Sequence, residues 1–316
     1  MPTYSICNIA LESDLSLPEL ERTKIPTPEI RFLMSRTALS DGVDCEWLQT
    51  WTLPDGTLWL AIGRQARGYL LRFQAMADFA LSSDAREILC YAVSDTPSET
   101  VRHLLLDQVL PLVLSWRGQL VVHGSAILTP KGTIAFVGDS GSGKSTLASS
   151  FAEDGMEVLT DDCLLLEEKE GCLTAIPSYP GVRLWPKVAD AMLGKGRVLA
   201  GVAHYTEKLR VNRSAGIRFS TRPAKMRRMY FLAPDEAGGQ IANVTISPLS
   251  SRDVVVELVK YTYLIDVTDR LRLLRDFERL GRVATQPLFY RLAFPHDFSR
   301  LAEVRQAILT NVGESE

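Results

Sequence analysis

A glycine-rich stretch in the middle of the chain has the residue types and the spacing of a phosphate-binding loop. Residues 138–145, GDSGSGKS, match the pattern G-x-x-x-x-G-K-[ST] at every fixed position. Glycine lets the backbone curl so that successive N–H groups converge on phosphate oxygens. Lys144 would reach the β- and γ-phosphates, and the Ser145 hydroxyl would ligate Mg²⁺. We therefore predict that the chain binds ATP or another nucleoside triphosphate with Mg²⁺, through Gly138, Asp139, Ser140, Gly141, Ser142, Gly143, Lys144, Ser145 and Thr146.

Two adjacent carboxylates end the next apolar run of the chain. Asp161 and Asp162 follow MEVLT, and neighbouring carboxylates repel each other unless a cation or a proton lies between them. Beside a phosphate loop, one of them can hold Mg²⁺ while the other accepts a proton from an attacking hydroxyl. The alternative is an ordinary turn or helix cap, where aspartate is common.

His123 lies in VVHGS, near the end of the apolar run before the loop strand. If these two runs form neighbouring strands, the imidazole comes close to the phosphate loop. A histidine with a purely structural hydrogen bond is the alternative.

Basic residues that follow the loop are candidates for contacts with phosphate or substrate. Kinases place positive charge on the transferring phosphoryl group in addition to the loop lysine, and the planar arginine side chain can bind two phosphate oxygens. The candidates are Arg183 in GVRLWP and Lys208 and Arg210 in EKLRVNRS. For each of them the alternative is a solvated surface charge.

The segments around these residues have the order that a phosphate-binding unit requires. TIAFV predicts a buried strand before the loop, residues 146–154 predict a helix, and MEVLT predicts a second buried strand. Strand, loop, helix and strand in this order are typical of an α/β fold with a P-loop.

Outside this unit, the sequence predicts a β-rich N-terminal domain and a helical C-terminal tail. Residues 1–97 hold short apolar and aromatic runs, with a hairpin signal at Asp55-Gly56. Residues 98–118 have helical spacing, with a kink expected at Pro111. Residues 250–284 and 297–312 also have helical spacing, and FYRLAFP is typical of a strand. We predict a β-rich accessory domain with a linking helix over 1–117 and an α/β P-loop domain over 118–316.

The composition is that of an ordinary globular protein. The 316 residues are 46% hydrophobic and 23% charged, with a formal net charge of −3, so the overall charge gives no sign of a nucleic-acid partner. The apolar runs are short and interrupted, and five scattered cysteines form no CxxC pair. We therefore expect a cytoplasmic protein with reduced thiols, no membrane partner, and possible homo-oligomers.

The stretch from His123 to Asp162 resembles the kinase core of the HPr kinase/phosphorylase family. That family has a histidine-glycine pair, a GDSGxGKS loop and an Asp-Asp pair at similar spacing; here His123 precedes Gly138 by 15 residues and Asp161 follows it by 23. The resemblance implies a fold related to phosphoenolpyruvate carboxykinase and the phosphorylation of a serine hydroxyl by ATP with Mg²⁺. It also implies that Asp161 is the general base, that Asp162 and Ser145 serve the metal, and that His123 assists.

Two departures from that pattern point to a particular branch. Thr146 stands where HPr kinases usually carry Glu, and YPGVRLWP at 179–186 stands where they carry an EIRGLGI-like motif. The sequence is similar instead to HPr-kinase-like proteins associated with lasso peptide biosynthesis, some of which phosphorylate the C-terminal serine of a precursor peptide. The expectation is a kinase of a serine-containing peptide or protein. A kinase of a small alcohol metabolite and a nucleotide-gated regulatory protein without transfer activity are the alternatives.

Overall fold

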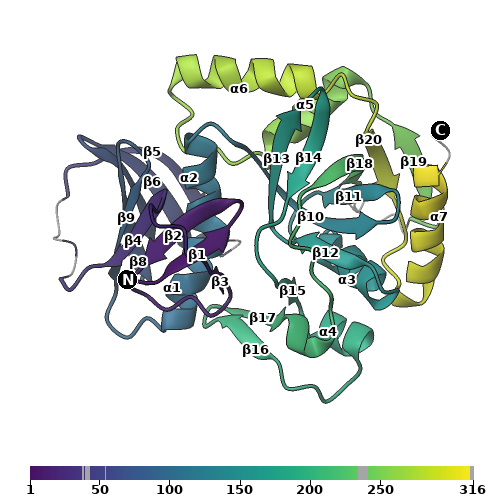
Figure 1. The fold of residues 1–316 in the computed structure, drawn as a ribbon, viewed down its shortest axis with the longest axis horizontal. Helices are drawn as coiled ribbons and strands as arrows, with labels where there is room; N and C mark the ends of the chain where they lie inside the picture. Colours follow the sequence, from purple (N-terminus) through teal and green to yellow (C-terminus); the bar gives the residue numbers. More distant parts are fainter. Residues whose placement is uncertain (38, 40–42, 54, 234–240, 314–316) are drawn as a thin grey trace. The chain divides into compact units, whose positions relative to one another are not determined.

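The computed structural model describes residues 1–37, 39, 43–53, 55–233 and 241–313. The chain divides into two compact units with a mixed α/β architecture (Figure 1). Unit 1 comprises residues 1–119 together with two short later segments, 202–206 and 264–270. Unit 2 comprises residues 120–201, 207–263 and 271–316, and it contains the glycine-rich loop.

Unit 1 is built on one large sheet. Its strands are β1 (Thr3–Ile6), β2 (Ile9–Ser13), β3 (Glu21–Arg22), β4 (Ile30–Met34), β5 (Glu46–Thr52), β6 (Leu58–Gln65), β7 (Gly68–Phe73), β8 (Ala77–Ser82) and β9 (Glu87–Ala92). They pair in the order β3-β1-β2-β4-β9-β8-β7-β6-β5. β4 is parallel to β2 and β9, and the other pairs are antiparallel. The expected hairpin lies between β5 and β6, around Gly56 with φ +86°; residue 54 is outside the described part.

The helix expected over residues 98–118 forms, but its middle is wider than an α-helix. It consists of α1 (Ser98–Leu104), a π-helical turn η1 (Leu105–Val109) and α2 (Leu110–Trp116). Pro111 is at the start of α2 and has no N–H to donate to the carbonyl four residues earlier, which is that of Asp107. The hydrogen-bond ladder is instead adjusted in the turn before the proline, as is common at such positions.

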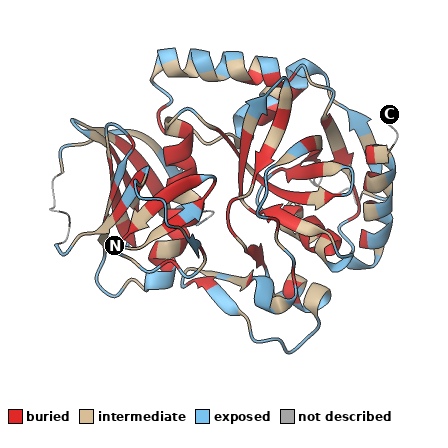
Figure 2. Cartoon of the chain, in the orientation of Figure 1, coloured by how far each residue is buried: buried red, intermediate tan, exposed pale blue. Residues whose placement is uncertain are grey.

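Unit 2 is also organised around a sheet. Its strands are β10 (Leu120–Thr129), β11 (Gly132–Val137), β12 (Glu157–Thr160), β13 (Cys163–Lys169), β14 (Cys172–Ile176), β18 (Ala224–Leu232), β19 (Thr245–Pro248) and β20 (Phe289–Ala293). They pair in the order β11-β10-β13-β14-β18-β20-β19, β12 pairs with β10, and β11 also pairs with β18 in parallel. The central strands of both units are largely buried (red in Figure 2), whereas the edge strands β3, β5 and β19 contain no buried residue.

Two helical layers cover this second sheet. The helices are α3 (Lys144–Glu153), α5 (Ser251–Tyr261), α6 (Arg270–Val283) and α7 (Leu301–Gly313), the last following a 3₁₀ turn η3 (Phe298–Arg300). Side chains alternate along β11, because successive residues of a strand point to opposite faces. Phe136 packs in one cluster with α3 and α7, and Val137 packs in the other with α5 and α6. The loop that follows β11 is therefore fixed from both sides of the sheet.

A smaller three-stranded sheet and a short helix lie in the chain between β14 and β18. β15 (Val182–Leu184) pairs antiparallel with β17 (Thr206–Val211), which is followed by a 3₁₀ turn η2 (Arg213–Ala215). β16 (Ala200–Ala203) is the third strand, and α4 (Pro186–Leu193) follows β15 directly. Their buried side chains form a separate cluster that includes Val158 of β12. This packing sets β15 next to the end of β12, where the aspartate pair lies.

Within the described ranges, no helix is both long and apolar enough to cross a membrane.

Candidate active site

The glycine-rich loop connects β11 to α3, in the order expected from the sequence. β11 is buried along most of its length, and α3 begins at Lys144, directly after Gly143. Gly143 has φ +97°, and a Cβ built on it would lie 3.1 Å from Cζ of Phe294. Both the left-handed backbone and the close aromatic ring therefore favour glycine at this position. The free N–H groups of the first turn of α3 can face an anion in front of the loop.

Lys144 is folded over the loop. Its Nζ donates to the carbonyl oxygens of Gly138 and Asp139, at 2.8 Å each, and the side chain is buried. Burial lowers the pKa of Lys144, although the charges of Asp162 and Asp161 oppose this; the charge of Lys208 acts with burial. The carboxylate of Asp139 in turn accepts a hydrogen bond from the Tyr261 hydroxyl at 3.2 Å. The loop backbone therefore positions the Lys144 ammonium group in front of the proposed phosphate site.

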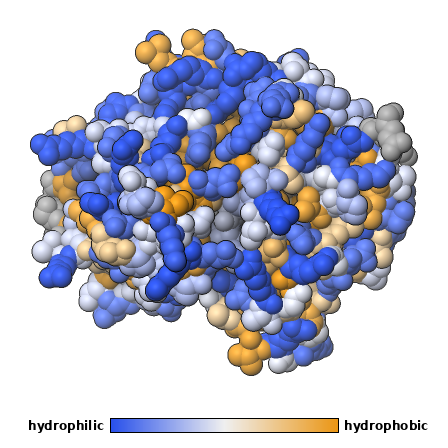
Figure 3. Space-filling model, in the orientation of Figure 1, coloured by the Kyte–Doolittle hydropathy of each residue, from blue (hydrophilic) through white to orange (hydrophobic). Residues whose placement is uncertain are grey.

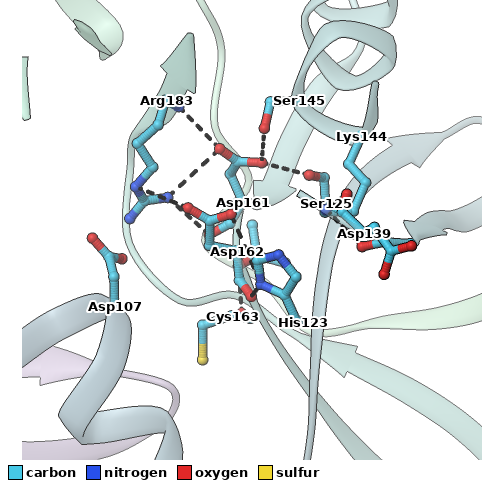
Figure 4. A network of polar contacts seen from close by, with 12 residues as sticks. Asp107, His123, Ser125, Asp139, Lys144, Ser145, Asp161, Asp162, Cys163 and Arg183 are labelled. Carbon is cyan, nitrogen blue, oxygen red and sulfur yellow. Dashed lines mark hydrogen bonds and ion pairs between the residues drawn. The ribbon is translucent and has the colours of Figure 1, made fainter. Parts of the chain in front are cut away.

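Asp161 is at the centre of the polar network (Figure 4). Its Oδ1 accepts hydrogen bonds from the hydroxyls of Ser145, at 2.9 Å, and Ser125. Its Oδ2 accepts from the backbone N–H of Arg183 at 2.9 Å. The residue is fully buried, and burial followed by the neighbouring charge of Asp162 raises its pKa. Both carboxylate oxygens are therefore engaged by protein donors, one of which is the predicted metal ligand Ser145.

Asp162 and His123 form the more accessible side of the network. Asp162 has φ +68°, so the backbone turns sharply and its side chain leaves the direction taken by Asp161; that side chain is 17% exposed. His123 lies opposite Cys163 in the β10–β13 ladder, which explains why it reaches the aspartate pair. Its side chain is 32% exposed, and its Nδ1 is 3.2 Å from the carbonyl oxygen of Asp162.

The partner of His123 fixes where its imidazole can accept a proton. A carbonyl oxygen only accepts hydrogen bonds, so Nδ1 carries the hydrogen and Nε2 is the acceptor of the neutral ring. Burial lowers the pKa of His123, although the charge of Asp162 opposes this. The Tyr263 hydroxyl contacts both atoms of this hydrogen bond, at 3.4 Å from His123 Nδ1 and 3.4 Å from the Asp162 carbonyl oxygen. His123 is therefore a neutral acceptor near neutral pH.

Arg183 was expected to contact phosphate or substrate, and the structure gives it an internal role. Its guanidinium is buried, with Nη1 2.8 Å from the Asp161 carbonyl oxygen and Nε 3.5 Å from Asp162 Oδ2. Nη2 donates to the Tyr179 hydroxyl, and the guanidinium carbon is 4.9 Å from the centre of the Tyr179 ring. Arg183 therefore balances the charge of the two aspartates.

Lys208 and Arg210 lie together on β17. Arg210 is opposite Arg183 in the β15–β17 ladder, and Lys208 Nζ is 5.6 Å from the Trp185 ring centre. The charge of Lys208 lowers the pKa values of both His123 and Lys144. Lys208 therefore contributes positive charge at the site.

The sequence reasoning missed several residues of the network: Ser125, Tyr179, Tyr261 and Tyr263. Ser125 had a usable signal, because it is two residues after His123 and so points to the same face of β10. The tyrosines had none, since their hydroxyls reach the site from a loop and from the end of α5.

Comparisons with known proteins give little further information. No protein-family model matches the chain, and no curated protein matches it. Among solved structures, the chain is similar to that of the Hpr(Ser) kinase/phosphatase from Coxiella burnetii, with 12% sequence identity and a TM-score of 0.32. The match covers 62% of this chain and 99% of that one. A score of this size does not establish a shared fold, so the function of this chain has to be inferred from the contacts within its own site.

Proposed function

We propose that this chain is an ATP- and Mg²⁺-dependent kinase that phosphorylates a serine hydroxyl of a peptide or protein. The observation that supports this best is the 2.9 Å contact between the Ser145 hydroxyl and Asp161 Oδ1, directly after a loop with the full phosphate-binding pattern. A hydroxyl from the loop and a carboxylate from the next strand are the pair of groups that P-loop enzymes use to bind their metal. Serine as the acceptor rests on the sequence resemblance.

The residues present fit a magnesium ion. Mg²⁺ prefers hard oxygen ligands and is commonly held by one or two protein groups, with water and phosphate completing the shell. Across the described residues, no group of three or more His, Cys, Asp and Glu side chains could hold a metal by itself, so a metal here would share its ligands with phosphates. The Ser145 hydroxyl oxygen would ligate the ion while Asp161 accepts the hydrogen bond of that hydroxyl and orients it, and the charge of the ion would neutralise the β- and γ-phosphate oxygens.

This assignment reverses the roles that the sequence resemblance implied for the two aspartates. Asp161 is fully buried, and its oxygens accept from Ser145, Ser125 and Arg183, so an acceptor hydroxyl cannot reach it without displacing these donors. Asp162 is partly exposed and lies beside His123. A general base has to be within hydrogen-bond reach of the proton that it takes. We therefore assign Asp161 to the metal site and Asp162 to the role of general base for the acceptor hydroxyl.

The proposed transfer step needs one proton acceptor and one source of positive charge. The serine oxygen forms a bond to the γ-phosphorus while the bond from that phosphorus to the β,γ-bridging oxygen breaks, and the serine proton passes to Asp162. Lys144 stabilises the negative charge on the phosphates, and Lys208 adds positive charge on the same side. His123, neutral and with Nε2 as acceptor, can orient the hydroxyl or receive the proton from Asp162.

Paired asparagine variants test the proposal. The purified chain is incubated with [γ-³²P]ATP, Mg²⁺ and a library of serine-containing peptides, and label on serine is counted. Asp162→Asn should lower transfer by about 10²–10⁴-fold while ATP still binds, because the amide cannot accept the proton. Asp161→Asn should instead raise the Mg²⁺ concentration needed for half-maximal ATP binding.

The matched control is Asp190→Asn, which removes an exposed carboxylate on α4 and should change neither quantity. Wild-type protein that binds ATP but labels no peptide would favour a small alcohol acceptor or a regulatory role. Retained transfer in Asp162→Asn would contradict the assignment of the base.

A further inference from the structure

Helix α6 exposes its apolar side. Leu271, Leu274 and Phe277 are 75%, 56% and 58% exposed. Asp276 and Arg279, which form an ion pair at 2.8 Å, are only 16% and 18% exposed and lie on the other side of the helix. A surface helix normally turns its apolar stripe toward the core, so the first part of α6 is inverted. Only its last turn, with Leu280 and Val283, packs in the core of unit 2.

Figures 2 and 3 show the same feature. α6 is largely pale blue and tan in Figure 2 until its last turn, which is red. In Figure 3, apolar atoms (orange) lie among polar ones at the edge where Figure 1 draws α6. This apolar stripe is therefore part of the surface in the described part of the chain.

The residues of the exposed face are arranged symmetrically about Leu274. Leu271 and Phe277 lie three residues before and after it, and Arg270 and Glu278 lie four residues before and after it. At 3.6 residues per turn, these five positions fall within about 120° around the helix axis. The order along the face is therefore basic, apolar, apolar, apolar, acidic.

We propose that this face of α6 pairs with α6 of a second copy of the chain, antiparallel and around a two-fold axis at Leu274. In a two-fold interface, residue i contacts residue j while residue j contacts residue i. With Leu274 on the axis, Leu271 of one copy meets Phe277 of the other, and Arg270 meets Glu278. The same contacts occur twice, so every apolar group is covered and every charge at the ends of the face has an opposite partner.

Charge complementarity favours a second copy over a lipid surface or an unrelated peptide. A helix that lies on an anionic membrane carries basic residues along its polar face, and α6 does carry Arg272, Arg275 and Arg282 outside the apolar face. The residue that disfavours a lipid surface is therefore Glu278. Here Glu278 is inside the exposed arc, at the end opposite Arg270, where it would face lipid phosphates. The symmetric order has no role in binding an unrelated partner, whereas it is what a self-complementary face requires. One helix pair is small compared with usual stable interfaces of about 1,200–2,000 Å², so the dimer should dissociate at low concentration.

Charge-swapped variants test this pairing in the full chain. Sedimentation velocity over a range of concentrations should show a reversible monomer–dimer equilibrium for the wild type. Glu278→Arg and Arg270→Glu should each weaken the dimer by about tenfold or more, because like charges then meet at both ends. The double variant, Arg270→Glu with Glu278→Arg, should dimerise nearly as well as the wild type. A mixture of the two single variants should form a heterodimer.

Leu274→Asp should abolish dimerisation, since two carboxylates would meet on the axis. Because these positions are exposed, far-UV circular dichroism should stay unchanged, and Asp190→Asn again serves as a control. A wild-type chain that stays monomeric at all concentrations would overturn the proposal. So would a dimer whose dissociation constant is unchanged by the charge swaps and by Leu274→Asp. Sedimentation of the monomer with phosphatidylglycerol vesicles, lost in Leu274→Asp, would overturn it in favour of membrane binding.

Discussion

Replacing Arg183 by methionine should destabilise the protein strongly and in a pH-dependent way. The guanidinium is 2% exposed and lies 2.8 Å from the Asp161 carbonyl, 3.7 Å from Asp161 Oδ2 and 3.5 Å from Asp162 Oδ2. Methionine keeps much of the side-chain volume but leaves two adjacent carboxylates without their buried cation. Removing one partner of a buried ion pair costs about 3–5 kcal/mol, and the lost stacking on Tyr179 adds about 0.5–2 kcal/mol. We therefore expect a loss of about 4 kcal/mol near neutral pH.

The pH dependence of this loss has a definite sign. The pKa of Asp161 is already raised by burial, and without the charge of Arg183 it should rise further. A carboxyl group with a raised pKa in the folded state keeps its proton there, while the unfolded chain releases it above the ordinary value of 3.8. The Arg183→Met variant is therefore most stable at acidic pH, and its free energy of unfolding falls as the pH rises through the folded-state pKa of Asp161. The penalty of Arg183→Met should be smaller at about pH 5 than at about pH 8.

Urea unfolding followed by circular dichroism at both pH values measures this loss. The matched control is Arg183→Lys, which keeps the positive charge but not the planar fork, and should cost less than the methionine variant at about pH 8. A loss below about 1 kcal/mol, or the same loss at both pH values, would show that Arg183 is not the charge partner of the aspartates.

Three further predictions concern the loop, the histidine and the direction of transfer. Gly143→Ala should weaken nucleotide binding more than Gly141→Ala in calorimetry: both residues have positive φ, but only at Gly143 does an added Cβ meet Phe294, at 3.1 Å. Because the pKa of His123 is lowered, the unfolding free energy should fall as pH drops below about 6.5, and His123→Gln should remove that part of the dependence in urea titrations. If the resemblance to HPr kinases holds, transfer should run forward from ATP, since YPGVRLWP at 179–186 stands in place of the EIRGLGI-like segment that the two-way enzymes of that family carry. Pyrophosphate release from a phosphorylated peptide with excess phosphate, at a rate near that of the forward reaction, would contradict this.

The parts of the site that local sequence could predict are those fixed by backbone geometry. The strand, loop and helix around residues 133–153 follow from an apolar run, a glycine pattern and helix-forming residues. The sequence predicted that His123 lies near the loop if its strand neighbours the loop strand, and β10 does pair with β11. Its position opposite Cys163, beside the aspartates, depends instead on β10 pairing with β13, which no local pattern indicates. The sequence could not show that Asp161 is buried and Asp162 partly exposed, because the two residues are of the same type and their burial depends on long-range packing.

The long C-terminal helical pattern shows the same limit. Residues 250–284 were expected to be helical throughout, and the structure instead ends α5 at Tyr261 and begins α6 at Arg270. The intervening segment contains Asp266, which is buried in unit 1 and accepts hydrogen bonds from Arg64 at 2.6 Å and Tyr69 at 2.7 Å. These partners are about 200 positions away in the sequence, so no local pattern could signal the break.

Nucleotide binding is the property on which the proposed kinase activity depends. Isothermal titration calorimetry of the wild-type chain with ATP should show binding that requires Mg²⁺. Lys144→Ala should weaken it by about 100-fold, because charge-assisted hydrogen bonds to phosphate contribute about 1.5–3 kcal/mol each. Ser145→Ala should reduce the Mg²⁺ dependence. Wild-type protein that binds neither ATP nor GTP in the presence of Mg²⁺, or that binds equally well without Lys144, would contradict the assignment of residues 138–145 as a phosphate-binding loop.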